Sequence, residues 1–391
     1  MSSGGEKKAI ALCLEYPIAD RGGVSVLVQE LVAGLSEDFA IRLVSPEPSE
    51  GVLASKIGAQ LAGHLSFQLM SVPPSPSYFK QARAFAEQLG DVRLVHFHCG
   101  GTFGWGNRCP APSIPEYCSK AGLKTVWTNH LTDPPRRAFA SVGRAPWISD
   151  LAAPIGKLGK IRQTRATDAE IAVSEHDRDY LDSQYPADQQ RRRIYHSRLE
   201  ESPAPGTERE PLILAVGHVA YRKGQDVLVR AFLNIAGTAP GWTLEIAGHD
   251  GGDGCWQEIE SLCANHPQGS RVKLLGAHPR PAELMGRASI FVQPSLEEAL
   301  GLALQEAIFL GCPAIGSRVG GIPEVIDEGE TGLLIEPKNV AALSAALSRL
   351  LVDAALRGQM GARGRDAILG KGMTRQRMIE AHRSLYLELL A

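Results

Sequence analysis

The segment PSLEEALGLALQEA, residues 294–307, joins a predicted strand to a predicted helix. The apolar residues before it indicate a buried strand that ends at Gln293, and the apolar spacing within it indicates a helix that begins near Gly301. The loop between the two carries Glu297 and Glu298. A strand, a polar loop and a helix in this order are typical of a parallel sheet that binds its ligands at the carboxyl ends of its strands.

This junction has the features of a binding site for phosphate or sugar hydroxyls. The first amides of a helix have no partner within the helix and bind anions, and Gly301 lets a ligand approach the backbone. Glu306 lies one to two turns into the helix, where its carboxylate can accept two hydrogen bonds from a ribose diol. Glu298, on the loop, reaches further toward the sugar. The alternative is that both glutamates are surface acids favoured at a helix N-terminus.

A second junction of the same kind follows the predicted strand 212–216. Gly217 ends that strand and Gly224 precedes the next helix, so both permit a tight turn. Arg222 and Lys223 place positive charge at the start of that helix, which suits a diphosphate. Taken alone, a lysine and a glycine at a helix start are usually part of a solvated loop.

Short apolar runs alternate with amphipathic segments along the whole chain. This alternation predicts βαβ units, parallel sheets and an α/β fold. The predicted strands are residues 9–15, 41–45, 66–72, 92–96, 125–128, 170–173, 212–216, 244–247, 272–275, 290–293 and 314–316. One predicted helix begins near Val24, and three others cover residues 224–235, 301–310 and 340–351.

The chain has 391 residues, which is enough for two domains. The segment ESPAPGTEREP, residues 201–211, has no apolar period and indicates a linker. We therefore expect an N-terminal domain over residues 1–205 and a C-terminal domain over residues 206–372. The last residues, 373–391, have apolar side chains at helical spacing and predict a closing helix whose apolar face must be buried.

Composition excludes several classes of protein. The net charge of −2 gives no field that would attract nucleic acid, and no stretch approaches the ~18 apolar residues of a transmembrane helix. The polar N-terminus has no secretory pattern. Seven scattered cysteines without a CxxC pair favour reduced thiols over a disulfide framework or a zinc site. We expect a cytoplasmic protein, monomeric or homodimeric, without a nucleic-acid partner.

The two junctions, together with GCPAIGSRVGGIPEVIDEGETGLLIEP at residues 311–337, resemble the C-terminal domain of family 4 retaining glycosyltransferases. The family's pair of glutamates separated by seven residues corresponds to Glu298 and Glu306. Its VGRL…KGxDxLxxAF motif corresponds to the segment from Val216 to Phe232. The resemblance implies the GT-B fold, in which two Rossmann-like domains with parallel sheets face each other across a cleft. It also implies that the closing helix crosses back to the N-terminal domain.

The resemblance assigns roles to individual residues. It implies that Lys223 binds the donor diphosphate, that Glu306 holds the ribose and that Glu298 touches the donor sugar. The amides of Leu300, Gly301 and Leu302 are expected to help hold that sugar. One position departs from the family, because His218 stands where members usually have arginine. A histidine is only partly charged near neutral pH, so we expect Arg222 to compensate for the missing charge.

The N-terminal half contributes further candidates. Gly22 and Gly23 follow the first predicted strand at a helix start, and the resemblance implies that they face the donor. The resemblance also implies that His130, after the strand 125–128, contacts hydroxyls of the donor sugar; an ordinary core or surface histidine is the alternative. His96 and His98 are two residues apart and would share one face of a strand, but no third metal ligand is evident.

Other segments of this half leave the acceptor unassigned. Residues 194–199 lack the asparagine–glycine turn of many members, and residues 104–112 match no family pattern. A local basic cluster leaves open contact with an anionic acceptor or a membrane surface, although a solvated face is the simpler interpretation. This cluster consists of Arg136, Arg137, Arg144, Lys157, Lys160 and Arg162.

The predicted function is transfer of a sugar, with retention of configuration, from a nucleotide-diphosphate sugar to a hydroxyl acceptor. The resemblance implies that the leaving phosphate takes the acceptor's proton, so the chain positions the substrates and stabilises charge. Neither a metal nor another cofactor is expected, and the candidate catalytic residues are Lys223, Glu298 and His130. The alternatives are a non-catalytic module that binds nucleotide sugars and a related epimerase or phosphorylase. The donor base, the sugar and the acceptor are not predicted.

Overall fold

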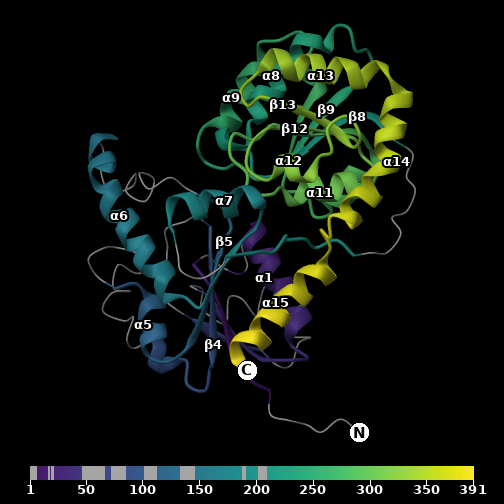
Figure 1. Ribbon diagram of the computed structural model, residues 1–391. Helices are drawn as coiled ribbons and strands as arrows, with labels where there is room; N and C mark the ends of the chain where they lie inside the picture. Colours follow the sequence, from purple (N-terminus) through teal and green to yellow (C-terminus); the bar gives the residue numbers. More distant parts are fainter. Residues whose placement is uncertain are drawn as a thin grey trace, which may run out of the picture. The chain divides into compact units, whose positions relative to one another are not determined.

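The chain folds into two compact units in a computed structural model (Figure 1). Unit 1 comprises Met1–Arg198 and Arg375–Ala391, and unit 2 comprises Leu199–Thr374. The structure describes residues 7–15, 18, 22–45, 67–71, 85–100, 112–132, 146–186, 191–200 and 209–391. For residues 67–71 and 146–152 it describes the backbone and not the side chains. Residues 201–208 of the expected linker, the segment 104–111 and Arg136, Arg137 and Arg144 lie outside the described residues. The expected linker extended too far, because Glu210 and Pro211 already belong to the first strand of unit 2.

Unit 1 is built on a parallel sheet with the strand order β3-β2-β1-β4-β5-β6-β7. The first strand, β1, lies in the interior of the sheet, and its apolar residues are buried because helices cover it. The strands are β1 Ala9–Leu14, β2 Ala40–Ser45, β3 Phe67–Ser71, β4 Leu94–Cys99, β5 Lys124–Asn129, β6 Ala169–Ala172 and β7 Arg192–Arg193. The helices are α1 Gly23–Leu35, α5 Ile114–Lys120, α6 Pro146–Ala166, α7 Glu175–Gln184 and α15 Arg375–Leu390.

Unit 2 has a second parallel sheet, with the order β10-β9-β8-β11-β12-β13. Its strands are β8 Glu210–Val216, β9 Thr243–Ala247, β10 Val272–Gly276, β11 Ala288–Gln293, β12 Ala314–Ser317 and β13 Gly332–Ile335. Its α-helices are α8 Gln225–Ala236, α9 Cys255–Ala264, α10 Pro281–Arg287, α11 Leu302–Phe309, α12 Ile322–Val325, α13 Val340–Val352 and α14 Ala354–Gly370. Short 3-10 turns cover Tyr221–Lys223 and Gly269–Arg271.

The prediction of an α/β fold with parallel sheets is confirmed, and the eleven predicted strands correspond to observed ones. The sequence interpretation missed β7 and β13, which have two and four residues. β7 consists of two arginines and so gives no apolar run. None of the described helices is long and apolar enough to cross a bilayer.

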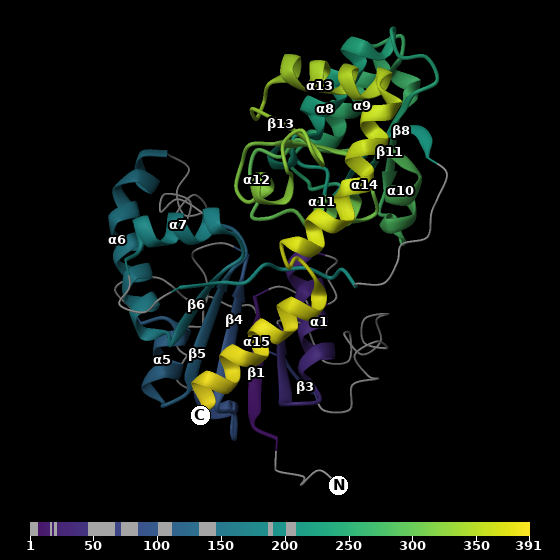
Figure 2. The same ribbon diagram turned by 45° about the vertical axis from the view of Figure 1, so that its right-hand side comes forward.

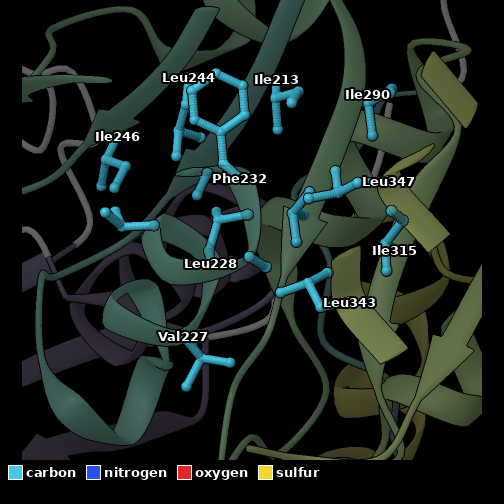
Figure 3. Packing of buried hydrophobic residues seen from close by; sticks show 14 of the residues in the cluster. Ile213, Val227, Leu228, Phe232, Leu244, Ile246, Ile290, Ile315, Leu343 and Leu347 are labelled. Atoms are coloured by element: carbon cyan, nitrogen blue, oxygen red, sulfur yellow. The ribbon is translucent and has the colours of Figure 1, made fainter. Parts of the chain in front are cut away.

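The core of unit 2 lies between its sheet and the helices α8 and α13 (Figure 3). Phe232 and Leu228 of α8 are buried together with Leu343 of α13. The sheet residues of this core come from five different strands, so burial of one face holds both halves of the sheet together. They include Ile213, Leu244, Ile246, Ile290 and Ile315.

Both sheets reverse their strand order beside the first strand of the unit. In unit 2 the chain passes from β8 through β9 to β10 on one side, and then returns to β11 on the other side of β8. The carboxyl edge between β8 and β11 is therefore the switch point at which open α/β sheets bind ligands. In unit 1, β1 and β4 have the same relation.

The terminal helix α15 packs within unit 1 against α1 (Figure 2). A Cβ atom on Gly34 of α1 would lie 2.2 Å from Cδ1 of Ile379, so glycine permits this close approach. Arg383 pairs with Asp38 at 2.7 Å beside the buried face of the helix. Ile379 and its buried neighbours on α15 explain the helical spacing of apolar residues in the sequence.

Imidazoles from separate segments gather beside α15. His96 and His98 of β4 do share a face, as predicted, with ring centroids 4.0 Å apart. The ring centroid of His130 lies 5.3 Å from that of His98 and 4.9 Å from that of His196. The ring centroid of His382, on α15, lies 5.7 Å from that of His96. Burial, together with the neighbouring imidazoles, holds the pKa of His96, His98, His130 and His196 well below the ordinary histidine value.

The hydrogen bonds of this histidine cluster favour neutral rings. Nδ1 of His382 donates to the carbonyl oxygen of Met378 at 2.8 Å, so its proton lies on Nδ1 and its buried Nε2 has no hydrogen-bond partner. Burial lowers the pKa of His382 to about 4, although the bond to Met378 favours the charged form. His96 lies 2.5 Å from the Tyr386 hydroxyl and 2.7 Å from Thr128 Oγ1, and both groups can donate or accept.

The histidine cluster predicts that acid destabilises the folded chain. Unfolded imidazoles bind protons below about pH 6.5, whereas the folded rings resist protonation until the pH falls further, to about 4 for His382. Stability should therefore fall as the pH falls through this window, by up to about 1.4 kcal/mol per pH unit for each imidazole. Urea denaturation between pH 7.5 and pH 5 should show a smaller loss for His382→Phe than for the unchanged chain.

The control for this measurement is His176→Gln, because His176 is exposed on α7 of the same unit. This variant should lose stability in acid as steeply as the unchanged chain. An equally steep loss in His382→Phe would contradict the role assigned to the buried ring.

Candidate functional site

The two junctions singled out in the sequence lie side by side at the carboxyl edge of unit 2. β8 leads through Gly217 and the turn Tyr221–Lys223 into α8, and β11 leads through residues 294–301 into α11. Because β8 and β11 are adjacent strands, these loops meet although they are far apart in the sequence. The backbone amide of Leu296 donates to the carbonyl oxygen of Arg222 at 2.8 Å, which ties one loop to the other.

An ion pair joins the loops at their centre. Nζ of Lys223 lies 2.5 Å from Oε2 of Glu298, and the two side chains are 18% and 13% exposed. Burial alone would raise the pKa of the Glu298 carboxyl, but Lys223, the charge of Arg222 and a hydrogen bond from Gln293 hold it below its ordinary value. Glu298 is therefore a carboxylate at neutral pH, and the nearby charge of Arg222 contributes to this.

Two glycines make the approach of these loops possible. Gly224 has a φ of +69°, and a Cβ atom there would lie 2.1 Å from the carbonyl oxygen of Pro294. Gly320, in the loop after β12, has a φ of +52°, and its Cβ atom would lie 1.6 Å from the carbonyl oxygen of Glu298. Any larger residue at either position would push the backbone that carries Glu298 away.

Helix α11 and the residues just before it supply four more of the predicted site residues, which are Leu300, Gly301, Leu302 and Glu306. Gly301 caps it with a φ of +91°, and Leu302 is its first residue. The amides of its first turn have no partner within the helix, as expected for a site that binds oxygen atoms. Leu300 and Glu306 are both buried, at 3% and 6% exposure, so Glu306 is not the surface acid of the alternative interpretation.

His218 also lies in unit 2, at the carboxyl end of β8. Its carbonyl oxygen accepts from Nε2 of Gln225 at 2.9 Å, and its ring centroid lies 6.1 Å from that of His249 after β9. The imidazole that replaces the family's arginine therefore has a second imidazole beside it at the same edge. The sequence did not single out His249.

Gly22, Gly23 and His130 belong to unit 1. Gly22 is the N-cap of α1, and its carbonyl oxygen accepts from the amide of Val26 at 3.2 Å. His130 follows β5, and its Nε2 lies 3.0 Å from Nδ1 of His98. Both sites are at the carboxyl ends of strands, where the sequence placed them.

The basic cluster of the sequence is in part internal. Lys160 is 1% exposed, and its Nζ lies 2.7 Å from Oε1 of Glu170. Arg162 pairs with Glu116 at 2.6 Å. The solvated face that the sequence favoured is therefore wrong for Lys160, whereas Arg162 is 39% exposed beside its partner Glu116.

Two residues beside Glu298 were missed as members of the site. Gln293 donates from Nε2 to Oε2 of Glu298 at 2.6 Å, and the Ser295 hydroxyl lies 3.4 Å from the same oxygen. The sequence showed only that they stand next to a loop with a carboxylate. Among the described residues, no group of three or more His, Cys, Asp or Glu side chains is arranged to hold a metal ion.

Two family models match the chain. The model of "Glycosyltransferase Family 4" matches residues 21–197, and that of "Glycosyl transferases group 1" matches residues 197–367. The chain belongs to the family 4 glycosyltransferases. Both of its halves carry the family's features, which agrees with the resemblance found in the motifs around Lys223 and Glu298.

Relatives with curated names support this membership. The chain is 30% identical over 184 residues to the N-acetyl-alpha-D-glucosaminyl L-malate synthase of Bacillus anthracis, a match that covers 47% of each chain. It is 29% identical over 334 residues to the D-inositol 3-phosphate glycosyltransferase of Nocardia farcinica, which covers 81% of this chain and 72% of that one. The chain thus spans about half the length of the first relative, and only 34% to 38% of several others.

A solved structure shows the same fold over almost the whole chain. An Anabaena protein in complex with UDP-glucose has a TM-score of 0.75 and covers 97% of this chain and 99% of its own, at 15% identity. At this identity the likeness shows the fold alone. The predicted GT-B fold class is confirmed.

The ion pair of the site predicts how unit 2 responds to a loss of charge. Lys223→Met leaves the Glu298 carboxylate without its closest cation, so the pKa of that carboxyl should rise. The variant should lose about 1–3 kcal/mol of stability at pH 7, and less at pH 5, where the carboxyl can take up a proton. Differences from the unchanged chain at each pH, measured by urea denaturation, test this.

Lys223→Met combined with Glu298→Gln should recover most of the loss, because no buried charge is left unpaired. The control is Lys273→Met, since Lys273 is 54% exposed beside Glu245 at 3.4 Å and Glu245 keeps Arg287 as a partner. It should change stability by less than about 0.5 kcal/mol. Equal losses for the single and the double variant would show that Lys223 does not compensate Glu298.

Proposed function

We propose that the protein transfers a sugar, with retention of configuration, from a nucleotide-diphosphate sugar to a hydroxyl acceptor. The observation that carries this proposal is the Lys223–Glu298 pair at the point where the strand order of unit 2 reverses. A cation and a carboxylate at one edge of the sheet match the two ends of such a donor, which are an anionic diphosphate and a sugar rich in hydroxyls. Membership of family 4 supports the same reaction.

Lys223 binds the diphosphate in this proposal. Its ammonium group is largely buried, so its attraction for phosphate is screened less than that of a surface lysine. Arg222 adds a second positive charge, and His218 stands near the same edge. These groups stabilise the charge that develops on the diphosphate as the bond to the sugar breaks.

Carboxylates on the loop and on α11 hold the rest of the donor. Glu306 accepts hydrogen bonds from the ribose hydroxyls, and Glu298 accepts from the sugar, because carboxylate oxygens are hydrogen-bond acceptors. The amides of Leu300, Gly301 and Leu302 are the donors that complement them.

Unit 1 contributes His130, with Gly22 and Gly23. Burial and the neighbouring imidazoles keep the pKa of His130 low, so its ring is neutral at pH 7 and can donate to or accept from a sugar hydroxyl. The glycines at the start of α1 offer amides to an anionic or hydroxyl group.

The proposed chemistry needs no protein nucleophile and no metal ion. The bond between sugar and diphosphate loosens toward an oxocarbenium-like state, and the leaving phosphate takes the proton of the incoming hydroxyl on the same face. The chain's contribution is to position the two substrates and to stabilise charge. We place this reaction in the cytoplasm, which the free thiols of the six described cysteines support.

Release of nucleoside diphosphate tests the proposed function. The purified chain is incubated with UDP-, GDP- and ADP-sugars, beginning with UDP-glucose because an Anabaena structure with the same fold binds it. The sugars of one of these nucleotides should release nucleoside diphosphate in the presence of chelator. Lys223→Ala should release it about 10²–10³-fold more slowly. Proton NMR of a glycoside product should show the donor's anomeric configuration. Inverted product, or equal rates for Lys223→Ala, would overturn the proposal.

Glu306→Ala should chiefly weaken the binding of the nucleotide. Loss of hydrogen bonds to a charged acceptor costs about 1.5–3 kcal/mol, or roughly 10- to 150-fold in Kd. Calorimetry with the free nucleoside diphosphate measures this without any acceptor. Glu330→Ala is the control, because Glu330 pairs with Arg363 on the exposed surface of the same unit and should leave affinity unchanged. Unaltered affinity in Glu306→Ala would refute the ribose assignment.

A further inference from the structure

Gln293 is the last residue of β11 and contacts the Glu298 side chain of the site. It is 7% exposed, and its Nε2 donates to Oε2 of Glu298 at 2.6 Å. Lys223 and Ser295 approach the same carboxylate oxygen, at 2.5 Å and 3.4 Å. Among the described residues, the side-chain hydrogen bonds of Glu298 all fall on Oε2. The other oxygen, Oε1, therefore keeps its capacity to accept from a ligand hydroxyl.

The other end of the Gln293 amide shows an unusual feature. Its Oε1 is buried and has no hydrogen-bond partner in the described part of the chain. A buried carbonyl without a partner costs stability, and an apolar side chain of similar size would avoid that cost. Glutamine at this position is therefore difficult to explain by stability, and its one hydrogen bond leads to the carboxylate of the site.

Gln293 is also restricted in where it can move. A Cβ atom on Gly301 would lie 3.0 Å from Nε2 and 3.5 Å from Cδ of Gln293, so the amide packs against the glycine that caps α11. The glutamine thus connects the start of that helix to Glu298. The donating amide of Gln293 is neutral, so it is not attracted by an anion as the ammonium group of Lys223 is.

We propose that Gln293 is a positioning residue, which fixes the Glu298 side chain so that Oε1 faces the donor sugar. This rests on the proposed function, because it assumes that Glu298 touches the sugar. Gln293 acts through Glu298 and does not itself contact the reacting atoms. It is a requirement for turnover and not for folding or for binding the nucleotide.

Gln293→Leu separates these possibilities. Its melting temperature should equal or exceed that of the unchanged chain, since the unpartnered carbonyl is removed. Affinity for the free nucleoside diphosphate should change less than about twofold, whereas kcat with the sugar donor should fall about tenfold or more. Adding Gln293→Leu to Glu298→Ala should cause no further loss in kcat, because both changes remove the same contact.

Gln293→Glu adds a pH test. Two carboxyl groups at hydrogen-bond distance cannot both ionise, so one proton is shared between them and the pair titrates at a raised apparent pKa. This variant should retain activity at the acid end of the profile and lose it as the pH rises, unlike the unchanged chain. Gln257→Leu is the matched control, because Gln257 donates to Asp250 at 3.1 Å on the exposed surface, and it should leave kcat unchanged.

Two results would overturn the inference while leaving the proposed function in place. One is a wild-type kcat in Gln293→Leu; the other is a loss of kcat matched by equal losses in melting temperature and nucleotide affinity, which would indicate a structural role. If the unchanged chain turns over none of the nucleotide sugars, the proposed function fails, and this inference fails with it.

Discussion

The close approach of the loop after β8 to the loop after β11 is the constraint on which the candidate site depends. It requires the two strands to be neighbours, and it requires Gly224 to have no side chain where the Pro294 carbonyl lies. Only then can Lys223 reach Glu298 and hold its carboxyl ionised despite burial. The order of the sheet, the glycine and the ion pair are thus one arrangement, which places a charged but largely buried pair of side chains at the edge of unit 2.

Much of this arrangement could be predicted from the sequence, because it depends on local patterns. Apolar runs of strand length located eleven of the thirteen described strands, and helical spacing located five of the twelve described α-helices, namely α1, α8, α11, α13 and α15. Glycines and charged residues directly after strands identified the edge at which parallel sheets bind ligands, and so singled out Lys223 and Glu298. The junction also singled out Glu306, and the resemblance to family 4 implied the same role, but no local pattern would have shown its burial on α11.

The remaining features could not be predicted because they join segments that are distant in the sequence. His382 meets His96 of β4 and His196 only after α15 has packed within unit 1. Lys160 has the sequence context of a surface lysine, since lysine is rarely buried, and only the fold brings Glu170 to it. The bond between Gln293 and Glu298 spans few residues, but it depends on the rotamers that packing against Gly301 selects.

The central claim is that the switch point between the ends of β8 and β11 receives a nucleoside diphosphate. A crystal structure of the chain with the diphosphate that it binds most tightly tests this directly. The account predicts a phosphate oxygen about 3 Å from Nζ of Lys223, with the ribose hydroxyls at Glu306 on α11. A nucleotide bound elsewhere on unit 2, with Lys223 still paired only to Glu298, would contradict it.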